Sequence, residues 1–341
     1  MAMSQVKVGM IGAGRIGRVH AENLAYRIPN AKLVAVADVI EPAAKQLAAA
    51  LQIPATYVDA APILADKNID AVVICSSTDT HAQLIEDAAA AQKHIFCEKP
   101  IALDLARIDR ALAAVDRAGV KLQVGFNRRF DPSFKRIREL VTTGALGQPH
   151  LLRITSRDPA PPPLAYVQVS GGIFLDMTIH DFDMARYLTG SEVEEVFAAG
   201  NVLVDPEIGK AGDLDTAVVT LRFANGALGM IDNSRKAVYG YDQRVEVFGS
   251  GGMALATNKT PDNVVQSDAV GVHTALPLHF FVERYAEAYV EEMRAFIQCI
   301  TEDTSPPVTG LDARVPVVIG YAALKSSKEN RPVRLSEVDR R

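Results

Sequence analysis

Three ionisable side chains stand at helical spacing in the middle of the chain. Asp176, His180 and Asp183 occupy positions i, i+4 and i+7, which a helix would place on one face. A histidine can accept the proton of an alcohol near neutral pH, and a neighbouring carboxylate can orient its ring or stabilise the imidazolium. We therefore interpret this stripe as a general base with acidic support.

Two other interpretations of the same stripe stay open. One histidine and two carboxylates could hold a metal ion, but no further His or Cys cluster completes such a site, and we predict no metal. Asp176 or Asp181 could instead cap the helix that runs to Leu188. A cap would explain one aspartate, but it would not explain a histidine with two more acids on the same face.

A lysine occupies a second position suited to chemistry. Lys99 lies between Glu98 and Pro100, directly after the apolar run His94–Cys97. Open α/β sheets bind ligands at the carboxyl ends of their strands, where an ammonium could hold a reacting oxygen and stabilise negative charge on it. An isolated lysine at a strand end is usually a solvated surface residue. The flanking residues, with the turn described next, favour the functional interpretation.

A glycine-rich turn near the N-terminus has the spacing of a dinucleotide-phosphate site. The motif G-x-G-x-x-G follows the apolar run Val6–Ile11 directly, as Gly12, Ala13, Gly14, Arg15, Ile16 and Gly17. In this motif the first glycine permits the turn, the second lets the backbone approach a pyrophosphate, and the third lets helix pack on strand. The helix that follows directs its amide donors at the anion.

An aspartate ends the next apolar run. Asp38 lies 38 − 17 = 21 residues past the last glycine, which is the spacing of a residue that binds the adenosine ribose hydroxyls. Its charge would repel a 2′-phosphate, and no Arg or Lys follows immediately. We therefore predict NAD rather than NADP as the cofactor. The alternative, a glycine turn without a ligand, is disfavoured by the combined pattern.

The elements expected to position these residues fall into two groups along the chain. Up to residue 125, unbroken apolar runs alternate with Ala- and Leu-rich helical stretches, which is typical of βαβ units and a parallel sheet. The apolar runs are Val6–Ile11, Leu33–Ala37, Ala71–Cys75, His94–Cys97 and Leu122–Gly125, and the helical stretches include Pro42–Leu51, Gln83–Ala91 and Leu105–Ala118. We predict a doubly wound Rossmann domain over residues 1–125.

The second half has longer strands without helices between them. Expected strands are Leu151–Ser156, Ala217–Phe223, Ala227–Asn233 and Arg244–Gly249, and expected helices are Asp131–Val141, Asp181–Leu188, Val282–Ile300 and Gly310–Ser327. The turn Ala224-Asn225-Gly226 indicates antiparallel pairing of two strands. We predict an α+β domain over residues 126–341, built on a largely antiparallel sheet, with its last helix able to pack back on the first domain.

Composition narrows the class of protein. A chain of 341 residues fits two domains, and its net charge of −5 argues against a nucleic-acid partner. The three cysteines are widely spaced and show no C-x-x-C pair, so neither a disulfide framework nor a zinc site is indicated. We find neither a secretory signal nor an apolar stretch of membrane-spanning length, and we expect a cytoplasmic protein.

The glycine turn, Glu98-Lys99-Pro100 and the segment from Gly172 to His180 together resemble the glucose–fructose oxidoreductase / inositol dehydrogenase / MocA-type family. The resemblance extends over nearly the whole chain. Within the family, residues 156–163 and 169–183 are most similar to the bacterial inositol 2-dehydrogenase subgroup. The resemblance implies an N-terminal Rossmann domain and a C-terminal domain whose open sheet often mediates assembly, so we expect a homotetramer.

The resemblance also implies roles for particular residues. Matches to the family's catalytic positions are Lys99, Asp176 and His180. Matches to positions that line the polyol site are Arg129, Asp183 and Tyr239, although Arg128 adjoins Arg129 and either could point inward. Matches along the nicotinamide side are Ser76, Ser77, Thr78 and His81, next to Glu98 and Lys99.

The expected activity is NAD-dependent oxidation of a secondary hydroxyl of a cyclic polyol, first of all myo-inositol to 2-keto-myo-inositol. A relative of this activity, acting on another inositol isomer, an aldose or an anhydrosugar, is the first alternative. A non-catalytic NAD-binding regulator is the alternative from another class. Loss of Lys99 or His180 would indicate a regulator, and the sequence retains both.

Overall fold

The computed structural model describes residues 5–339, which divide into two compact units. The first comprises residues 5–130 with 287–315, and the second comprises 131–286 with 316–339. Each unit is built around a sheet of its own. The three cysteines are buried free thiols. No described helix combines the length and the apolar character needed to cross a bilayer.

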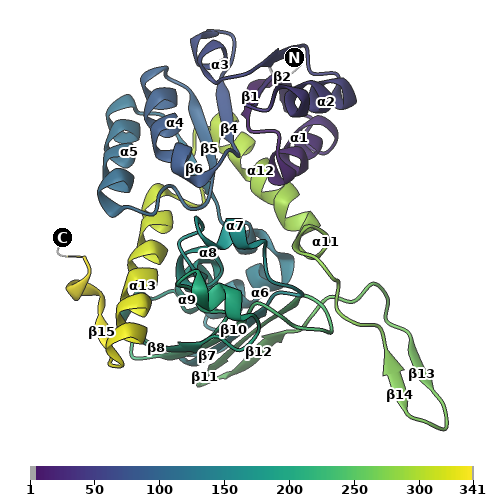
Figure 1. The fold of residues 1–341 in the computed structure, drawn as a ribbon, viewed down its shortest axis with the longest axis vertical. Helices are drawn as coiled ribbons and strands as arrows, with labels where there is room; N and C mark the ends of the chain where they lie inside the picture. Colours follow the sequence, from purple (N-terminus) through teal and green to yellow (C-terminus); the bar gives the residue numbers. More distant parts are fainter. Residues whose placement is uncertain (1–4, 340–341) are drawn as a thin grey trace. The chain divides into compact units, whose positions relative to one another are not determined.

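The sheet of the first unit has six parallel strands in the order β3-β2-β1-β4-β5-β6 (Figure 1). The strands are β1 Val6–Ile11, β2 Ala31–Ala37, β3 Ala55–Tyr57, β4 Ala71–Ile74, β5 His94–Glu98 and β6 Leu122–Gly125. All of β4 is buried, as expected of a strand that helices cover on both faces. The order reverses between β1 and β4, where such sheets bind ligands at the carboxyl ends of the strands. The predicted doubly wound fold is confirmed.

Helices cover both faces of this sheet. They are α1 Arg15–Tyr26, α2 Glu41–Leu51, α3 Ala61–Ala65, α4 Thr78–Ala90, α5 Leu105–Ala118 and α12 Ala286–Thr301, with a 3-10 turn at Asn127–Phe130. In Figure 1, α4 and α5 lie on one face, and α1 and α12 lie on the other. Met293, Phe296 and Ile297 of α12 share a core cluster with Val8 and Met10 of β1. A helix distant in sequence therefore completes the core of this unit.

The second unit contains a seven-stranded sheet in the order β12-β11-β7-β10-β9-β8-β15. The strands are β7 Pro149–Arg157, β8 Val193–Asn201, β9 Thr216–Phe223, β10 Leu228–Ser234, β11 Asp242–Gly249, β12 Gly252–Ala256 and β15 Val333–Arg334. Strands β10 and β7 pair in parallel, and the other described neighbours pair antiparallel. The β9–β10 turn contains Gly226 at φ +87°. The predicted largely antiparallel sheet is confirmed.

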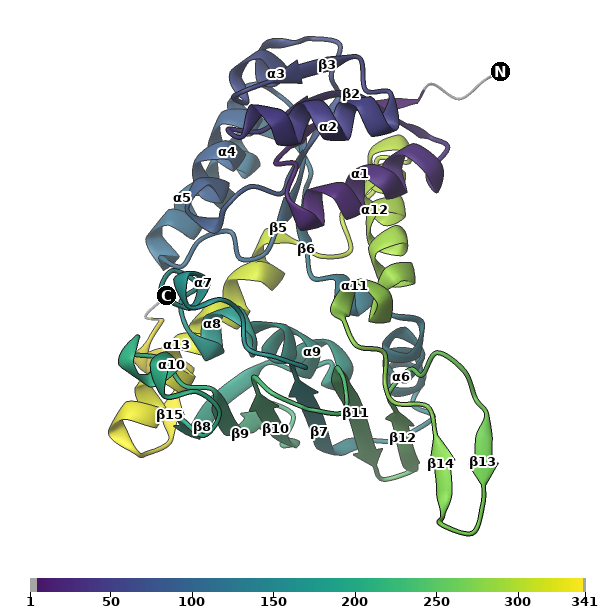
Figure 2. The ribbon, with the colours of Figure 1, turned by 45° about the vertical axis from the view of Figure 1, so that its right-hand side comes forward.

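Helices pack against one face of this sheet, as Figure 2 shows for α6, α8 and α9. The helices are α6 Pro132–Thr142, α7 Leu164–Val167, α8 Ile173–Asp176, α9 Ile179–Thr189, α10 Pro206–Lys210, α11 Phe281–Arg284 and α13 Gly310–Glu329, whose first turn belongs to the first unit. Burial alternates along β9, with Val219 and Leu221 buried and Val218 exposed. The opposite face is therefore open.

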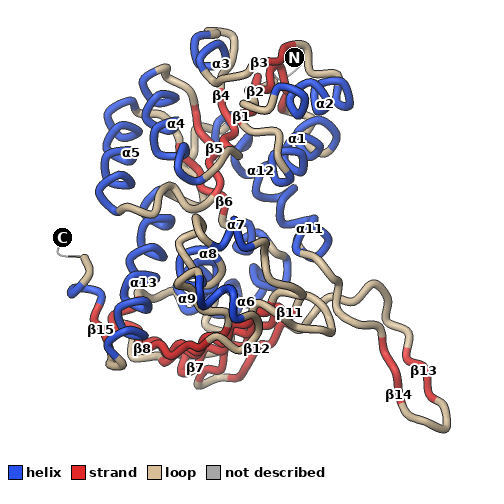
Figure 3. Tube along the Cα trace, in the orientation of Figure 1, coloured by secondary structure: helices blue, strands red, loops and turns tan. Residues whose placement is uncertain are grey.

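Several elements were not predicted, among them a hairpin and strand β8. A separate hairpin joins β13 Val265–Ser267 to β14 Val272–Thr274 (Figure 3). Strand β8 carries two glutamates, two alanines and a glycine among nine residues. These residue types are depleted in strands, so local composition gave little indication of β8, and pairing with β9 and β15 determines it.

Candidate active site

The turn between β1 and α1 needs each of its three glycines for a different reason. Gly12 has φ +101°, and a Cβ there would lie 2.5 Å from the carbonyl of Cys75. A Cβ at Gly17 would lie 2.1 Å from the carbonyl oxygen of Gly12. A Cβ at Gly14 would meet nothing within 4 Å, and no side chain caps the N-terminus of α1. The turn thus leaves backbone amides open to a pyrophosphate, and it fits a dinucleotide.

Asp38 lies beside this turn at the end of β2. Its Oδ2 accepts a hydrogen bond from the Ala13 amide at 2.7 Å, and its Oδ1 accepts one from the Ile40 amide at 2.8 Å. These two amides fix a partly exposed carboxylate next to the phosphate turn. That placement would suit a carboxylate that accepts hydrogen bonds from the ribose hydroxyls.

The predicted nicotinamide-side residues follow β4. Ser76 Oγ and Thr80 Oγ1 are 2.6 Å apart, and Thr80 also donates to the Ser77 carbonyl. His81 is only 2% exposed. Its ring nitrogens lie 2.9 Å from the Pro100 carbonyl and 3.1 Å from the Ser76 carbonyl. His81 therefore ties the segments after β4 and β5 to each other.

Lys99 follows β5 at the carboxyl edge of the same sheet. The Lys99–Pro100 peptide is cis, and Lys99 is partly buried. The neighbouring Glu98 turns its carboxylate to His20 on α1, with Oε1 2.7 Å from Nε2. The first unit thus gathers the glycine turn, Asp38, the residues after β4 and Lys99 at one sheet edge.

The two candidate arginines differ in their surroundings. Arg129 Nη2 lies 3.0 Å from Asp312 Oδ1. Burial works against ionisation of Asp312, but Arg129 and the Thr309 amide outweigh it and hold the pKa of Asp312 below its ordinary value. Arg128 is 5% exposed. Both arginines belong to the first unit.

The stripe of Asp176, His180 and Asp183 is not one continuous helix, which corrects the prediction. Helix α8 ends at Asp176, and α9 begins at Ile179. The break coincides with a buried tertiary hydrogen bond, in which Thr178 Oγ1 donates to Asn233 Oδ1 on β10 at 2.8 Å. His180 and Asp183 still share a face of α9. Asp176 lies at the end of the preceding helix, α8.

Sequence reasoning missed the residues that hold Asp176. The Tyr166 hydroxyl donates to Asp176 Oδ1 at 2.8 Å, and Arg235 Nη1 lies 3.4 Å from Oδ2. The Arg235 side chain is 1% exposed and also lies 3.4 Å from Asp213 Oδ2. Burial and the Asp176 charge raise the pKa of Tyr166 well above its ordinary value, so its hydroxyl stays a donor. The sequence around Arg235 does not distinguish a buried arginine from a solvated one.

The neighbouring acids on α9 have separate partners. Asp181 is fully buried, and its Oδ2 accepts from Asn233 Nδ2 at 2.8 Å. Thr178 is the N-cap of α9, and no side chain caps that end. Asp183 is fully buried, whereas His180 is partly exposed. Asp181 therefore anchors α9 to β10.

Tyr239 is fixed by charged neighbours before β11. Its hydroxyl donates to Asp242 Oδ2 at 2.6 Å and accepts from Arg157 Nη1 at 3.1 Å. Burial and the bond to Asp242 raise its pKa. The second unit thus contains Asp176, His180, Asp183 and Tyr239, whereas Lys99 and Arg129 belong to the first.

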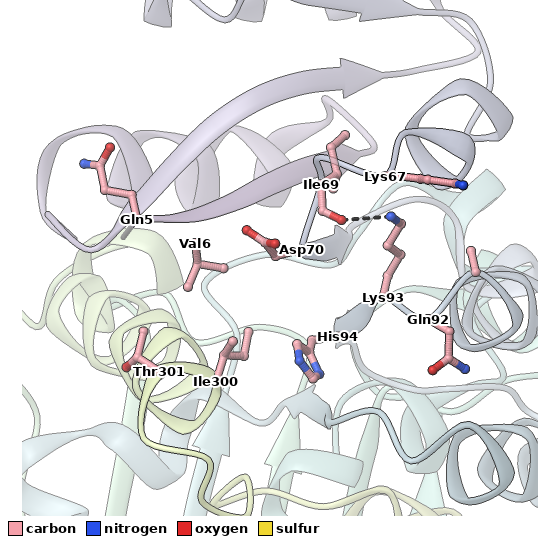
Figure 4. Close-up of a pocket in the computed structure, with 11 residues that line it drawn as sticks. Gln5, Val6, Lys67, Ile69, Asp70, Gln92, Lys93, His94, Ile300 and Thr301 are labelled. Carbon is pink, nitrogen blue, oxygen red and sulfur yellow. Dashed lines mark hydrogen bonds between the residues drawn. The ribbon is translucent and has the colours of Figure 1, made fainter. Parts of the chain in front are cut away.

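A pocket of about 730 Å³ opens at the other edge of the first sheet (Figure 4). Its lining includes Val6, Asp70 and His94, which stand at or next to the starts of β1, β4 and β5. The Lys93 ammonium beside it donates to the carbonyls of Asp66 and Ile69 at 2.7 and 2.8 Å. Because this is the amino edge of the strands, the pocket is separate from the phosphate turn.

The fold and the phosphate turn define a dinucleotide-binding oxidoreductase, and family comparison agrees. Residues 6–126 match the model described as oxidoreductase family, NAD-binding Rossmann fold, and residues 134–255 match the GFO/IDH/MocA C-terminal domain. The chain belongs to this family of NAD-binding oxidoreductases.

Individual relatives match over almost their full length. The chain is 55% identical to a myo-inositol 2-dehydrogenase of Thermotoga maritima, covering 98% of this chain and 99% of the relative. It is 47% identical to an inositol 2-dehydrogenase of Rhizobium meliloti, with 97% and 99% covered. Among solved structures, it is similar to a scyllo-inositol dehydrogenase of Lactobacillus casei with bound NAD(H) and scyllo-inositol, at TM-score 0.91 and 31% identity over 98% and 100% of the two chains.

Proposed function

We propose that this enzyme oxidises the C2 hydroxyl of myo-inositol with NAD, giving 2-keto-myo-inositol, NADH and a proton, as a step of inositol catabolism in the cytoplasm. One observation carries the proposal. The chain retains Lys99, Asp176 and His180 within a family fold, and relatives that act on myo-inositol or inositol share about half of its residues end to end. The intact catalytic set supports an enzyme rather than a regulator.

In the proposed mechanism each side chain has one task. His180 accepts the hydroxyl proton at a ring nitrogen. Asp176, oriented by Tyr166 and Arg235, stabilises the imidazolium that results. The Lys99 ammonium holds the hydroxyl oxygen and stabilises charge that develops on it. The phosphate turn and Asp38 would hold NAD, which would supply the acceptor for the hydride lost from C2 as the carbonyl double bond forms. Arg129, Asp183 and Tyr239 bind the remaining hydroxyls.

Deuterium labelling tests which carbon of the substrate is oxidised. With myo-inositol deuterated at C2, the enzyme is expected to transfer the label to the reduced cofactor, so mass spectrometry should find singly deuterated NADH. Unlabelled NADH from this substrate would show that another carbon is oxidised. Scyllo-inositol serves as the comparison substrate, because faster turnover with it would favour the alternative isomer.

Asp38 is proposed to set the preference for NAD. Replacing it with serine removes a charged acceptor of the ribose hydroxyls, and bonds to a charged group contribute about 1.5–3 kcal/mol. We expect NAD to bind about 10- to 100-fold more weakly. The ratio of the affinity for NAD to the affinity for NADP should therefore fall. Fluorescence titration with both reduced cofactors measures this ratio. An exposed aspartate on α5, changed as Asp116→Ser, is the control, and an unchanged ratio in Asp38→Ser would refute the assignment.

The open sheet face supports assembly into a homotetramer. Four apolar side chains on neighbouring strands are cross-strand partners, each of the next: Leu228 of β10, Leu151 of β7, Phe248 of β11 and Met253 of β12. All four are between 44 and 51% exposed. They form an apolar row across four strands. Contiguous apolar surface of this kind marks an interaction site, and we propose that further copies of the chain cover it.

Sedimentation velocity tests this assembly. The native protein is expected to sediment as a tetramer, and Leu151→Glu with Leu228→Glu should produce smaller species, because two charges would be buried in an apolar contact. Val39→Glu, at an exposed position of the first unit, should leave the tetramer intact. A native protein that sediments as a monomer would contradict the proposal.

A further inference from the structure

A buried polar cluster in the first unit includes Glu98. It contains His20 from α1, Glu98 from the end of β5 and Glu292 from α12, and one nitrogen or oxygen atom of each lies within 4.8 Å of those of the other two. His20 and Glu292 are fully buried, and the Glu98 side chain is 13% exposed. None of these three residues belongs to the phosphate turn. Glu98, however, directly precedes Lys99 in the chain.

The Glu98 carboxylate is held in one orientation. His20 Nε2 donates to Glu98 Oε1 at 2.7 Å. The imidazole is itself fixed by edge-on contacts with Phe96 and Tyr289, at centroid distances of 5.0 and 5.6 Å. On β6, a Cβ at Gly125 would lie 2.9 Å from Glu98 Oε2. A side chain at residue 125 would therefore displace the carboxylate from this position.

Glu292 differs from an ordinary surface glutamate of an amphipathic helix. Both of its carboxylate oxygens are buried without a hydrogen-bond partner among the described residues. Its backbone carbonyl accepts from Gln123 Nε2 at 2.7 Å, which ties α12 to β6. Burial first, and then the charge of Glu98, raise the pKa of Glu292 far above its ordinary value. Burial and the neighbouring carboxylate therefore favour the protonated, neutral form of Glu292.

Two thiols also interact with the cluster, and neither of them carries a positive charge. Cys75, after β4, has its pKa raised by burial and by Glu98, Cys97 and Glu292, so its thiol is neutral. The same holds for Cys97 on β5, through burial and Glu98. A second carboxylate charge at Glu292 would thus repel the Glu98 carboxylate in a medium of low dielectric. The cluster holds together while Glu292 stays neutral.

We propose that His20 is a positioning residue that acts on Lys99 through the Glu98 carboxylate, and that Glu292 is a neutral neighbour that leaves this carboxylate in place. The proposal rests on the role assigned to Lys99 above. A displacement of about 1 Å at a reacting group can lower the rate about 10²-fold, so anchoring the residue before Lys99 matters for chemistry. Neither side chain touches the substrate or the cofactor in this scheme.

A double-mutant cycle with Lys99 tests the coupling. His20→Phe keeps an aromatic ring against Phe96 and Tyr289 but releases Glu98. We expect kcat to fall about tenfold or more with the NAD dissociation constant nearly unchanged. In a Lys99→Met background the same change should have almost no further effect on kcat. An equal loss in both backgrounds, or an unaltered kcat in the single variant, would overturn the proposal.

The cycle separates two failures. If Lys99→Met by itself keeps full activity, the role of Lys99 in the proposed function is wrong. If Lys99→Met is inactive while His20→Phe is fully active, only the positioning role is wrong.

Glu292→Gln is the conservative variant, because it keeps the shape and the donor of a neutral acid. It should retain kcat at pH 7, and a loss of tenfold or so would show that a charged carboxylate is needed. In the unfolded chain Glu292 ionises near 4.5, whereas the folded chain keeps its proton to higher pH. Native stability therefore falls as pH rises above that value. The melting temperature of Glu292→Gln relative to wild type should rise as the pH increases above about 5, and a constant difference would contradict a neutral Glu292.

Discussion

Replacing His180 with alanine is expected to lower kcat for polyol oxidation by about 10²- to 10⁴-fold, the range that a general base contributes. The proton of the substrate hydroxyl would then have no acceptor positioned to take it as hydride leaves. NAD affinity should be nearly unchanged, because the phosphate turn and Asp38 belong to the first unit and His180 to the second. Steady-state kinetics and a cofactor titration measure the two quantities separately.

His273→Ala is the matched control for this experiment. His273 lies on β14, with 55% of its side chain exposed, and its loss should leave kcat unaltered. If His180→Ala turned over at the wild-type rate, His180 would not be the base. Asp176→Asn should reproduce part of the defect, since the amide cannot stabilise an imidazolium as a carboxylate does.

Lys99→Met is expected to lower kcat by about 10²- to 10³-fold, the cost of removing one preorganised donor from a developing oxyanion. Methionine keeps the length and the apolar stem of the side chain but removes the ammonium. The loss should appear mainly in kcat, because the interaction strengthens as charge develops on the oxygen. Steady-state kinetics with saturating NAD give kcat and KM separately.

Lys45→Met provides the control at an exposed surface position on α2, where Lys45 pairs with Glu41. Lys99→Arg keeps a positive charge with different geometry and should recover only part of the rate. A rise in KM with kcat unchanged in Lys99→Met would mean that the ammonium binds the substrate without stabilising the transition state.

The phosphate turn could be predicted from sequence because backbone geometry dictates its residue types. Gly12 has a positive φ, and Gly17 lies too close to the Gly12 carbonyl for any side chain. Such requirements are local and appear directly as a motif. The parallel sheet was predictable for a similar reason, since strands covered on both faces need unbroken apolar runs.

The arrangement around Asp176 depends on contacts that sequence spacing does not contain. The spacing of Asp176, His180 and Asp183 predicts one helix. In the structure the helix is interrupted after Asp176, next to a buried hydrogen bond that Thr178 donates to Asn233. Asn233 lies 55 residues further on. Local helix preference is a weak determinant that a tertiary contact can override.

Glu292 shows a signal that sequence reasoning could have used. Tyr289, Glu292, Met293 and Phe296 stand at i, i+3, i+4 and i+7, which places a glutamate within an apolar helical stripe. The adjacent Glu291 is partly exposed, while Glu292 is fully buried. The pattern indicates a buried acid but not its partners, because α1 and β5 lie far from α12 in the chain.

The central claim is that one enzyme couples NAD to a cyclic polyol, and turnover by the purified protein tests it most directly. Absorbance of NADH would be followed with NAD and, in turn, myo-inositol, scyllo-inositol, glucose and an anhydrosugar. Turnover is expected with myo-inositol, at a higher kcat/KM than with the other three compounds. Binding of NAD with no NADH formed from any of the four compounds would contradict this activity.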